Sequence, residues 1–307
     1  MGIEPSEIVV IGDLPPDVRA ALAADFDLRD HLLEGSAARD VASLPRDCRA
    51  IATRAVLGVP PGAIEALPNL GLVLSLGAGI DRIDREALAA RGITLAHTAD
   101  QFTEDVADFA LGLIYAAQRG IVAADRFSRS GAWLGVRFRT TRRVSNRRVG
   151  IVGLGRIGAR IAEKCTALGM AVAYYSRTPR PESGYAYRAD LLALAEASDI
   201  LVLALAASAG TRHLITADVL AALGPDGILV NVARGSVVDE AALLDALESG
   251  TLGGAALDVF ANEPDFDQRF RALDNVVLTP HAATFTFEAR QAVIDHLVAE
   301  AHRFFAA

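Results

Sequence analysis

Short apolar runs alternate along the chain with longer stretches in which apolar residues recur every three or four positions. In the first third of the chain, four such runs are followed by helix-like or Gly/Pro-marked segments, and they occupy residues 8–15, 49–54, 72–79 and 93–98. Strands that alternate with helices are typical of α/β domains, whose sheets are largely parallel. The pattern therefore predicts an α/β fold.

A longer helix is predicted from Glu104 to Arg119. Acidic residues in its first turn favour a start near Thr103, and its apolar positions share one face over about four turns. That face consists of Val106, Ala110, Leu113, Ile114 and Ala117.

The following stretch, residues 120–148, is basic and rich in turn-forming residues. It contains eight arginines between Arg126 and Arg148 and the only tryptophan of the chain, Trp133. Two interpretations stay open. The stretch is either a solvated connecting loop or an arm that packs on a partner or a neighbouring subunit.

Length and charge limit the classes of protein that need to be considered. At 307 residues the chain exceeds the size at which one core usually keeps growing, so two domains are expected. The net charge of −8 disfavours a nucleic-acid partner, and no apolar run approaches the roughly 20 residues that span a membrane. The two cysteines are too few for a disulfide framework or a zinc site. We expect a cytoplasmic protein with no bound metal, no nucleic-acid partner and no membrane association.

A glycine-rich motif in mid-chain has the context of a dinucleotide-binding site. A strand at residues 149–152 runs into Gly153-Leu-Gly155-Arg-Ile-Gly158, which is followed by a helical stretch and a second strand. Gly153 permits the tight turn, Gly155 lets the backbone approach a pyrophosphate, and Gly158 lets helix and strand pack closely. The helix N-terminus supplies N–H groups and partial positive charge for the phosphates.

Because the first strand of the chain has no such loop, the motif marks a second domain. We expect a flavodoxin-like substrate-binding domain at residues 1–98 plus 284–307, and a Rossmann dinucleotide-binding domain at residues 99–283. Both are expected to contain parallel sheets, with a substrate site in the cleft between them.

The residues after the second strand of the Rossmann motif favour NADP over NAD. NAD sites usually place an acid there to hold the ribose 2′-hydroxyl, whereas this chain has Ser176, Arg177, Thr178 and Arg180. Guanidinium groups fit a 2′-phosphate through paired, charge-assisted hydrogen bonds. The alternative is that the two arginines only face solvent.

Three polar residues follow apolar strand-like runs further along the chain: Arg234, Glu263 and His281. In a parallel sheet all three belong to the carboxyl edge, where ligands bind. There an arginine can hold a carboxylate, a histidine can donate a proton to a developing alkoxide, and a carboxylate can orient that histidine. The set predicts the reduction of a carbonyl group. The other five histidines are assigned structural roles.

At these residues the chain resembles the D-2-hydroxyacid dehydrogenase family, and more narrowly its NADPH-linked glyoxylate/hydroxypyruvate and hydroxyphenylpyruvate reductases. The resemblance covers almost the whole chain. It is carried by the segments at residues 77–84, 105–114, 149–158, 231–240, 253–264 and 279–283.

The resemblance implies a role for each matching position. Arg234 would bind the substrate, His281 would be the acid/base with Glu263 as its partner, and the N–H groups of Ala78 and Gly79 would grip the substrate carboxylate. Asp258 would lie near the nicotinamide amide. Further cofactor contacts are expected from Leu154, Arg156, Ile157, Ala206, Thr211, Val232, Ala233, Arg234, His281 and Ala283.

The resemblance also implies a homodimer whose interface uses the region around residues 100–145. In related reductases a tryptophan in this region reaches the partner subunit's substrate pocket, a role that stays open for Trp133.

The expected reaction is reduction of a small anionic 2-keto acid, glyoxylate or hydroxypyruvate, by NADPH to a D-2-hydroxy acid. Two alternatives remain: a reductase for bulky aryl-pyruvates such as hydroxyphenylpyruvate, and an NADP(H)-sensing binding protein without turnover.

Overall fold

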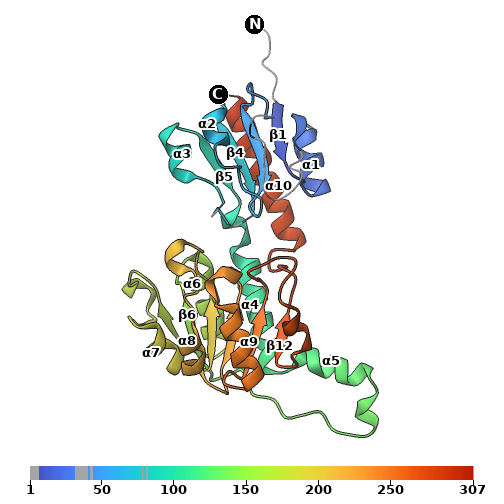
Figure 1. Ribbon diagram of the computed structural model, residues 1–307, viewed down its shortest axis with the longest axis vertical. Coiled ribbons are helices and arrows are strands. Elements are labelled where there is room, and N and C mark those ends of the chain that lie inside the picture. The colour runs from blue at the N-terminus through green and yellow to red at the C-terminus, as the bar shows by residue number, and fades with distance from the viewer. Residues whose placement is uncertain (1–6, 32–40, 42–43, 78, 81, 307) are drawn as a thin grey trace. The chain divides into compact units, whose positions relative to one another are not determined.

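The computed structural model describes residues 7–31, 41, 44–77, 79–80 and 82–306 (Figure 1). The chain forms two compact units, one of residues 1–102 and 285–307 and the other of residues 103–284. We describe each unit by itself. That the first unit binds the substrate stays a prediction.

The first unit contains a five-stranded parallel sheet in the order β2-β1-β3-β4-β5. Its strands are β1 (Glu7–Ile11), β2 (Asp27–His31), β3 (Ala50–Arg54), β4 (Leu72–Leu76) and β5 (Thr94–His97). Its helices are α1 (Pro16–Ala23), α2 (Ala63–Ala66), α3 (Arg85–Ala90), the 3₁₀ turn η2 (Ala99–Phe102) and α10 (Phe287–Phe305). Four of the five strands were predicted. The edge strand β2 was missed because its sequence, DLRDH, is mostly polar and exposed.

The second unit contains a seven-stranded parallel sheet in the order β12-β11-β10-β9-β6-β7-β8. Its strands are β6 (Arg148–Val152), β7 (Ala171–Tyr175), β8 (Ala186–Tyr187), β9 (Ile200–Leu203), β10 (Ile228–Asn231), β11 (Gly254–Leu257) and β12 (Val276–Leu278). The chain leaves β6 through β7 and β8 and then returns to β9 on the other side of β6. Such a reversal of strand order opens a crevice at the carboxyl ends of the two strands, where ligands bind.

Helices cover both faces of this sheet. They are α4 (Thr103–Gln118), α6 (Arg156–Ala167), α7 (Leu191–Glu196), α8 (Ala217–Leu223) and α9 (Glu240–Ser249). The unit also contains α5 (Ile121–Arg129) and the short 3₁₀ turns η3 (Ala132–Leu134), η4 (Pro181–Ser183), η5 (Ala209–Thr211), η6 (Gly235–Val237) and η7 (Gln268–Ala272). Apolar residues of α4 and α6 form one core with the sheet, and those of α7, α8 and α9 form a second core with it.

The predicted helix that starts near Thr103 is confirmed as α4, and so is its apolar face: four of the five predicted residues are buried, and Ala117 packs against the core. Gln118 is 5% exposed, whereas the neighbouring Ala117 is only partly buried. Of the two interpretations left open for the stretch after this helix, that of a connecting loop does not hold for residues 121–129, which form α5. No residue of α5 is buried, so this helix has no core-facing apolar stripe from which the sequence could have predicted it.

Among the described residues, no single helix has the length and apolar character needed to cross a membrane. Two consecutive helical segments, Ala99–Gln118 and Ile121–Arg129, reach that length and apolar character only when they are taken together, and they are bent by 59° relative to one another.

Candidate active site

The glycine loop lies directly after the central strand β6. Gly153 has φ +96°, a left-handed conformation that favours glycine, and its N–H donates to Tyr175 O at 2.8 Å. A Cβ on Gly158 would come within 2.0 Å of Gly153 O, so only glycine allows this close packing. A Cβ on Gly155 would meet nothing within 4 Å. The space beside Gly155, at the N-terminus of α6, therefore fits a pyrophosphate that approaches the backbone closely.

The other residues predicted in this loop differ in burial: Leu154 is buried, Ile157 is partly buried and Arg156 is exposed. Leu154 is 2% exposed and belongs to the core with α4 and α6. Arg156 and Ile157 begin α6, and Arg156 is exposed. Because its side chain is buried, Leu154 can contribute to a cofactor site only through its backbone.

The turn after β7 is held by internal hydrogen bonds. Ser176 Oγ donates to Thr178 O at 2.6 Å, and the Tyr174 hydroxyl accepts the Arg180 N–H at 2.6 Å. Arg177 and Arg180 are both exposed, and neither forms an ion pair with another described residue. This turn adjoins the glycine loop through the Gly153–Tyr175 hydrogen bond, which brings two guanidinium-bearing residues to the same end of the sheet.

The loop after β9 closes on itself through Thr211. Its Oγ1 donates to Ala206 O at 3.1 Å and accepts from Ser208 N at 2.8 Å. The predicted contact residues Ala206 and Thr211 thus belong to one compact turn.

Arg234 follows β10 and is positioned by a residue that the sequence analysis did not single out. Asn231, 1% exposed, accepts from Ala233 N at 3.0 Å and donates through Nδ2 to Arg234 O at 3.1 Å. Arg234 itself donates to Ala233 O at 2.7 Å. The sequence feature that could have identified Asn231 is its position as the one polar residue at the end of the apolar strand β10. Val232 and Ala233, both predicted cofactor contacts, lie in this segment.

Glu263 and His281 are brought together from the turns that follow β11 and β12. Glu263 Oε2 lies 2.7 Å from His281 Nδ1, and Glu263 Oε1 accepts from Phe260 N at 2.8 Å. Burial tends to raise the pKa of Glu263. The hydrogen bonds from His281 and Phe260, with the charges of His281 and Arg234, outweigh it and hold this pKa below its usual value. With Nδ1 engaged, Nε2 is the ring nitrogen that can serve a substrate.

Asp258 holds the turn that carries His281. Its side chain is 1% exposed and accepts from Thr279 Oγ1 at 2.6 Å, Ala282 N at 2.8 Å and Ala283 N at 3.1 Å. Its backbone carbonyl accepts from His281 N at 2.9 Å. His281 has φ +54°, which is unusual for a residue other than glycine, and these bonds hold it there. The contact of Asp258 and Ala283 with a cofactor stays a prediction.

The remaining predicted residues lie outside the second unit or on its surface. Gly79 follows β4 in the first unit, where Gly77 N donates to Thr98 Oγ1 at 2.8 Å. Ala78 lies outside the described residues. Trp133 belongs to η3 and is 72% exposed.

A parallel sheet with a glycine loop at the reversal of its strand order, and an Arg, a Glu and a His at the same edge, defines the class of dinucleotide-dependent dehydrogenases. The chain belongs to the D-isomer specific 2-hydroxyacid dehydrogenase family, whose NAD-binding domain matches residues 111–283.

Curated relatives and solved structures agree with this membership. The chain is 42% identical over 269 residues to hydroxyphenylpyruvate reductase of Plectranthus scutellarioides, which covers 87% of this chain and 86% of the relative. It is 44% identical to a glyoxylate/hydroxypyruvate reductase of Arabidopsis thaliana over 83% of this chain and 82% of the relative. An NADPH-dependent glyoxylate/hydroxypyruvate reductase of Sinorhizobium meliloti, solved with NADP and malonate, superposes with a TM-score of 0.88 at 39% identity. That match covers 97% of this chain and 93% of the other.

Replacing Asp258 by Ala should destabilise the second unit. Thr279 Oγ1 and the two backbone N–H groups of Ala282 and Ala283 would lose a buried acceptor, at a cost of about 3 kcal/mol in the free energy of unfolding. Urea unfolding measures this value, with the exposed Asp265→Ala as the control, expected to change it by less than about 0.5 kcal/mol. If Asp258→Ala unfolds, Asp258→Asn, which keeps one oxygen, serves instead. Equal stability of the Asp258 and Asp265 variants would contradict the role given to Asp258.

Proposed function

We propose that the protein reduces small 2-keto acids, such as glyoxylate and hydroxypyruvate, to D-2-hydroxy acids with NADPH. The observation that carries this proposal is the 2.7 Å contact of Glu263 with His281, at the sheet edge that also bears Arg234 and the glycine loop. The names of the relatives support the substrate class, since several of them are glyoxylate or hydroxypyruvate reductases.

In the proposed reaction each side chain has one task. Arg234 holds the substrate carboxylate and polarises the keto oxygen. NADPH, when bound at the glycine loop, would supply the hydride. His281 donates the proton from Nε2 to the keto oxygen, and Glu263 orients the ring through Nδ1. One hydride and one proton convert the carbonyl group to an alcohol, which is primary from glyoxylate and secondary from hydroxypyruvate.

The preference for NADPH is proposed from the turn after β7. Arg177 and Arg180 are exposed and unpaired among the described residues, so both are available to a 2′-phosphate, with the hydroxyls of Ser176 and Thr178 nearby in the sequence. No carboxylate stands in that turn before Glu182 to hold a ribose diol. The NADP-bound relative from Sinorhizobium meliloti supports this choice.

We also propose that the chain forms a homodimer through the arm made of α5, η3 and the loop that follows them. This arm extends away from the sheet of its own unit (Figure 1). It exposes four apolar side chains, with exposed fractions of 51% for Ile121, 72% for Trp133, 97% for Leu134 and 60% for Val136. So many exposed apolar groups on one segment favour burial against a second copy. The cytoplasmic location and the absence of nucleic-acid and membrane partners remain predictions from the sequence.

The reaction is tested by following NADPH oxidation, with NADH in parallel, against glyoxylate, hydroxypyruvate, pyruvate and hydroxyphenylpyruvate. The proposal expects fast turnover of the small acids with NADPH. Faster turnover of hydroxyphenylpyruvate would favour the second candidate, a reductase for aryl-pyruvates, which the 42% identity to the Plectranthus enzyme supports. Binding of NADPH without turnover of any of the four would point instead to a sensor and would contradict the proposal.

Glu263→Gln should change the pH profile of reduction. The pKa of Glu263 lies below its usual value, so its carboxylate stays ionised across the assay range, and this anion attracts the imidazole proton. The rate should fall at alkaline pH when that proton is lost. Removing the anion should move the midpoint of kcat/KM to lower pH. The exposed Glu248→Gln is the control, and an unchanged midpoint in Glu263→Gln would remove Glu263 from its role.

Replacing Arg177 and Arg180 together by Ala should lower kcat/KM for NADPH by about 10- to 100-fold, because charge-assisted bonds to the 2′-phosphate are lost. The value for NADH should change little, since NADH lacks this phosphate. The nearby exposed Arg188→Ala is the matched control. An equal loss with both cofactors would contradict the assignment of these arginines.

Leu134→Asp should convert the dimer to a monomer, because it places a charge within the proposed interface. Light scattering after gel filtration gives the mass. Leu192→Asp on α7, at a leucine that is 40% exposed, is the control and should leave the dimer intact. A wild-type monomer would overturn the proposal of a dimer.

A further inference from the structure

The short stretch of backbone from Phe260 N to Ala261 N is held on three sides. Its neighbour Glu263 accepts from Phe260 N at 2.8 Å, and Glu240 Oε1 accepts from Ala261 N at 2.7 Å. On the third side lies Gly235, where an added Cβ would come within 1.9 Å of the Phe260 carbonyl carbon. Two carboxylates thus bind consecutive N–H groups of the turn that leads to Glu263.

The side chain of Phe260 fixes the start of the same turn. It is 7% exposed and stacks on Phe266 with ring centroids 4.3 Å apart and 18° between the planes. It also contacts Phe270, with centroids 6.2 Å apart. The turn is therefore anchored in the core at Phe260, whereas Ala261 and Asn262, between this anchor and Glu263, are exposed and depend on polar contacts.

Glu240 reaches this turn because it is the first residue of α9. The preceding residue, Asp239, caps the helix by accepting from Ala242 N at 3.1 Å, which fixes the first turn of α9. An acid at this end is also favoured by the helix dipole. The position of the Glu240 carboxylate is therefore set by secondary structure.

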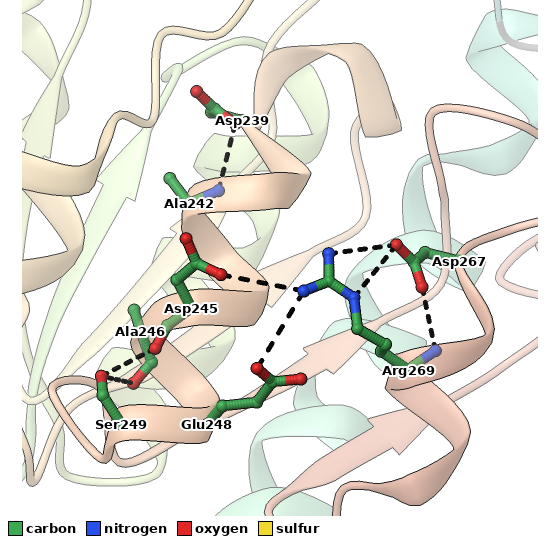
Figure 2. A network of polar contacts seen from close by, with 8 residues as sticks. All are labelled: Asp239, Ala242, Asp245, Ala246, Glu248, Ser249, Asp267 and Arg269. Carbon is green, nitrogen blue, oxygen red and sulfur yellow. Dashed lines mark hydrogen bonds and ion pairs between the residues drawn. The ribbon is translucent and has the colours of Figure 1, made fainter.

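A second contact joins α9 to the segment after Glu263, and it is solvent-exposed. Figure 2 shows Arg269 between Asp267 and the two acids of α9, Asp245 and Glu248. The distances are 3.2 Å to Asp267, 3.8 Å to Asp245 and 4.0 Å to Glu248, and the arginine side chain is 47% exposed. Exposed pairs of this kind contribute little to stability. They provide controls on the same helix.

The surroundings of Glu240 are unfavourable to its charge. Burial raises the pKa of Glu240, and the negative charges of Asp267 and Glu263 raise it further, while the Ala261 N–H and His213 act in the opposite direction. A partly buried acid close to another acid needs a compensating contact. The Ala261 N–H supplies one.

We propose that Glu240 is a positioning residue for the reduction. By accepting the Ala261 N–H it fixes the 260–263 turn, so that one carboxylate, Glu263, reaches both Phe260 N and His281 Nδ1. Glu240 has no contact with His281 and acts only through Glu263. The role in catalysis rests on the proposed function, whereas the role in holding the turn does not.

Three substitutions at Glu240 separate its hydrogen bond from its charge. Glu240→Ala removes the acceptor, and Glu240→Asp withdraws it by one methylene and serves if the Ala variant does not fold. Glu240→Gln keeps an acceptor oxygen without the charge. The control is Glu248→Ala, which breaks only the exposed contact with Arg269.

Amide hydrogen exchange in the ligand-free protein tests the turn itself. Exchange at Ala261 and Phe260 should rise about tenfold or more in Glu240→Ala, less in Glu240→Asp, and stay within about threefold of wild type in Glu240→Gln and Glu248→Ala. Unchanged exchange in both Glu240→Ala and Glu240→Asp would overturn the proposal, whether or not the wild-type protein turns over a 2-keto acid.

Kinetics test the step from the turn to catalysis. In Glu240→Ala, kcat should fall about tenfold and the alkaline midpoint should move to lower pH, as in Glu263→Gln, while KM for NADPH stays within about twofold. In the Glu263→Gln background the added Glu240→Ala should lower kcat less than twofold. An equal fall in both backgrounds, or an unmoved midpoint, would show that Glu240 does not act through Glu263. A wild-type enzyme without turnover would instead refute the proposed function.

Discussion

The contact between Glu263 and His281 depends on two turns, each of which is held by a carboxylate more than twenty residues away in the sequence. One follows β11 and the other follows β12, and neighbouring parallel strands bring them to the same edge. Each turn is fixed by a carboxylate that binds backbone N–H groups: Glu240 on the first turn and Asp258 on the second. The 2.7 Å contact between Glu263 and His281 therefore depends on residues from several segments at this edge of the sheet.

Backbone N–H groups and glycines determine much of the hydrogen bonding and close packing at this edge of the sheet. Gly153 and Gly158 allow a close approach of loop and helix, and Gly235 allows the Phe260–Ala261 peptide to pack beside the segment that carries Arg234. A side chain at any of the three positions would clash with backbone atoms. Glycine thus allows close packing against backbone both in the glycine loop and beside the turn that leads to Glu263.

The sequence revealed what depends on pattern and order. The parallel sheets, the helix at Thr103, the glycine loop and the strand-end placement of Arg234, Glu263 and His281 all follow from periodicity, motif context or the polar residues that end apolar runs. It did not reveal β2, whose polar residues resemble a loop, or α5, which buries no side chain. Asn231, Thr279 and Glu240 were also missed, because their tasks are hydrogen bonds to segments that become neighbours only after folding.

His281→Asn tests the central claim most directly, since it removes the proposed proton donor but keeps a polar side chain. Single-turnover reduction of glyoxylate or hydroxypyruvate at saturating NADPH gives the rate, and fluorescence titration gives the Kd for NADPH. We expect the rate to fall about 10²- to 10⁴-fold with the Kd within about twofold of wild type. A rate within a few-fold of wild type would contradict the assignment of His281 as proton donor and, with it, the purpose of the Glu263 contact.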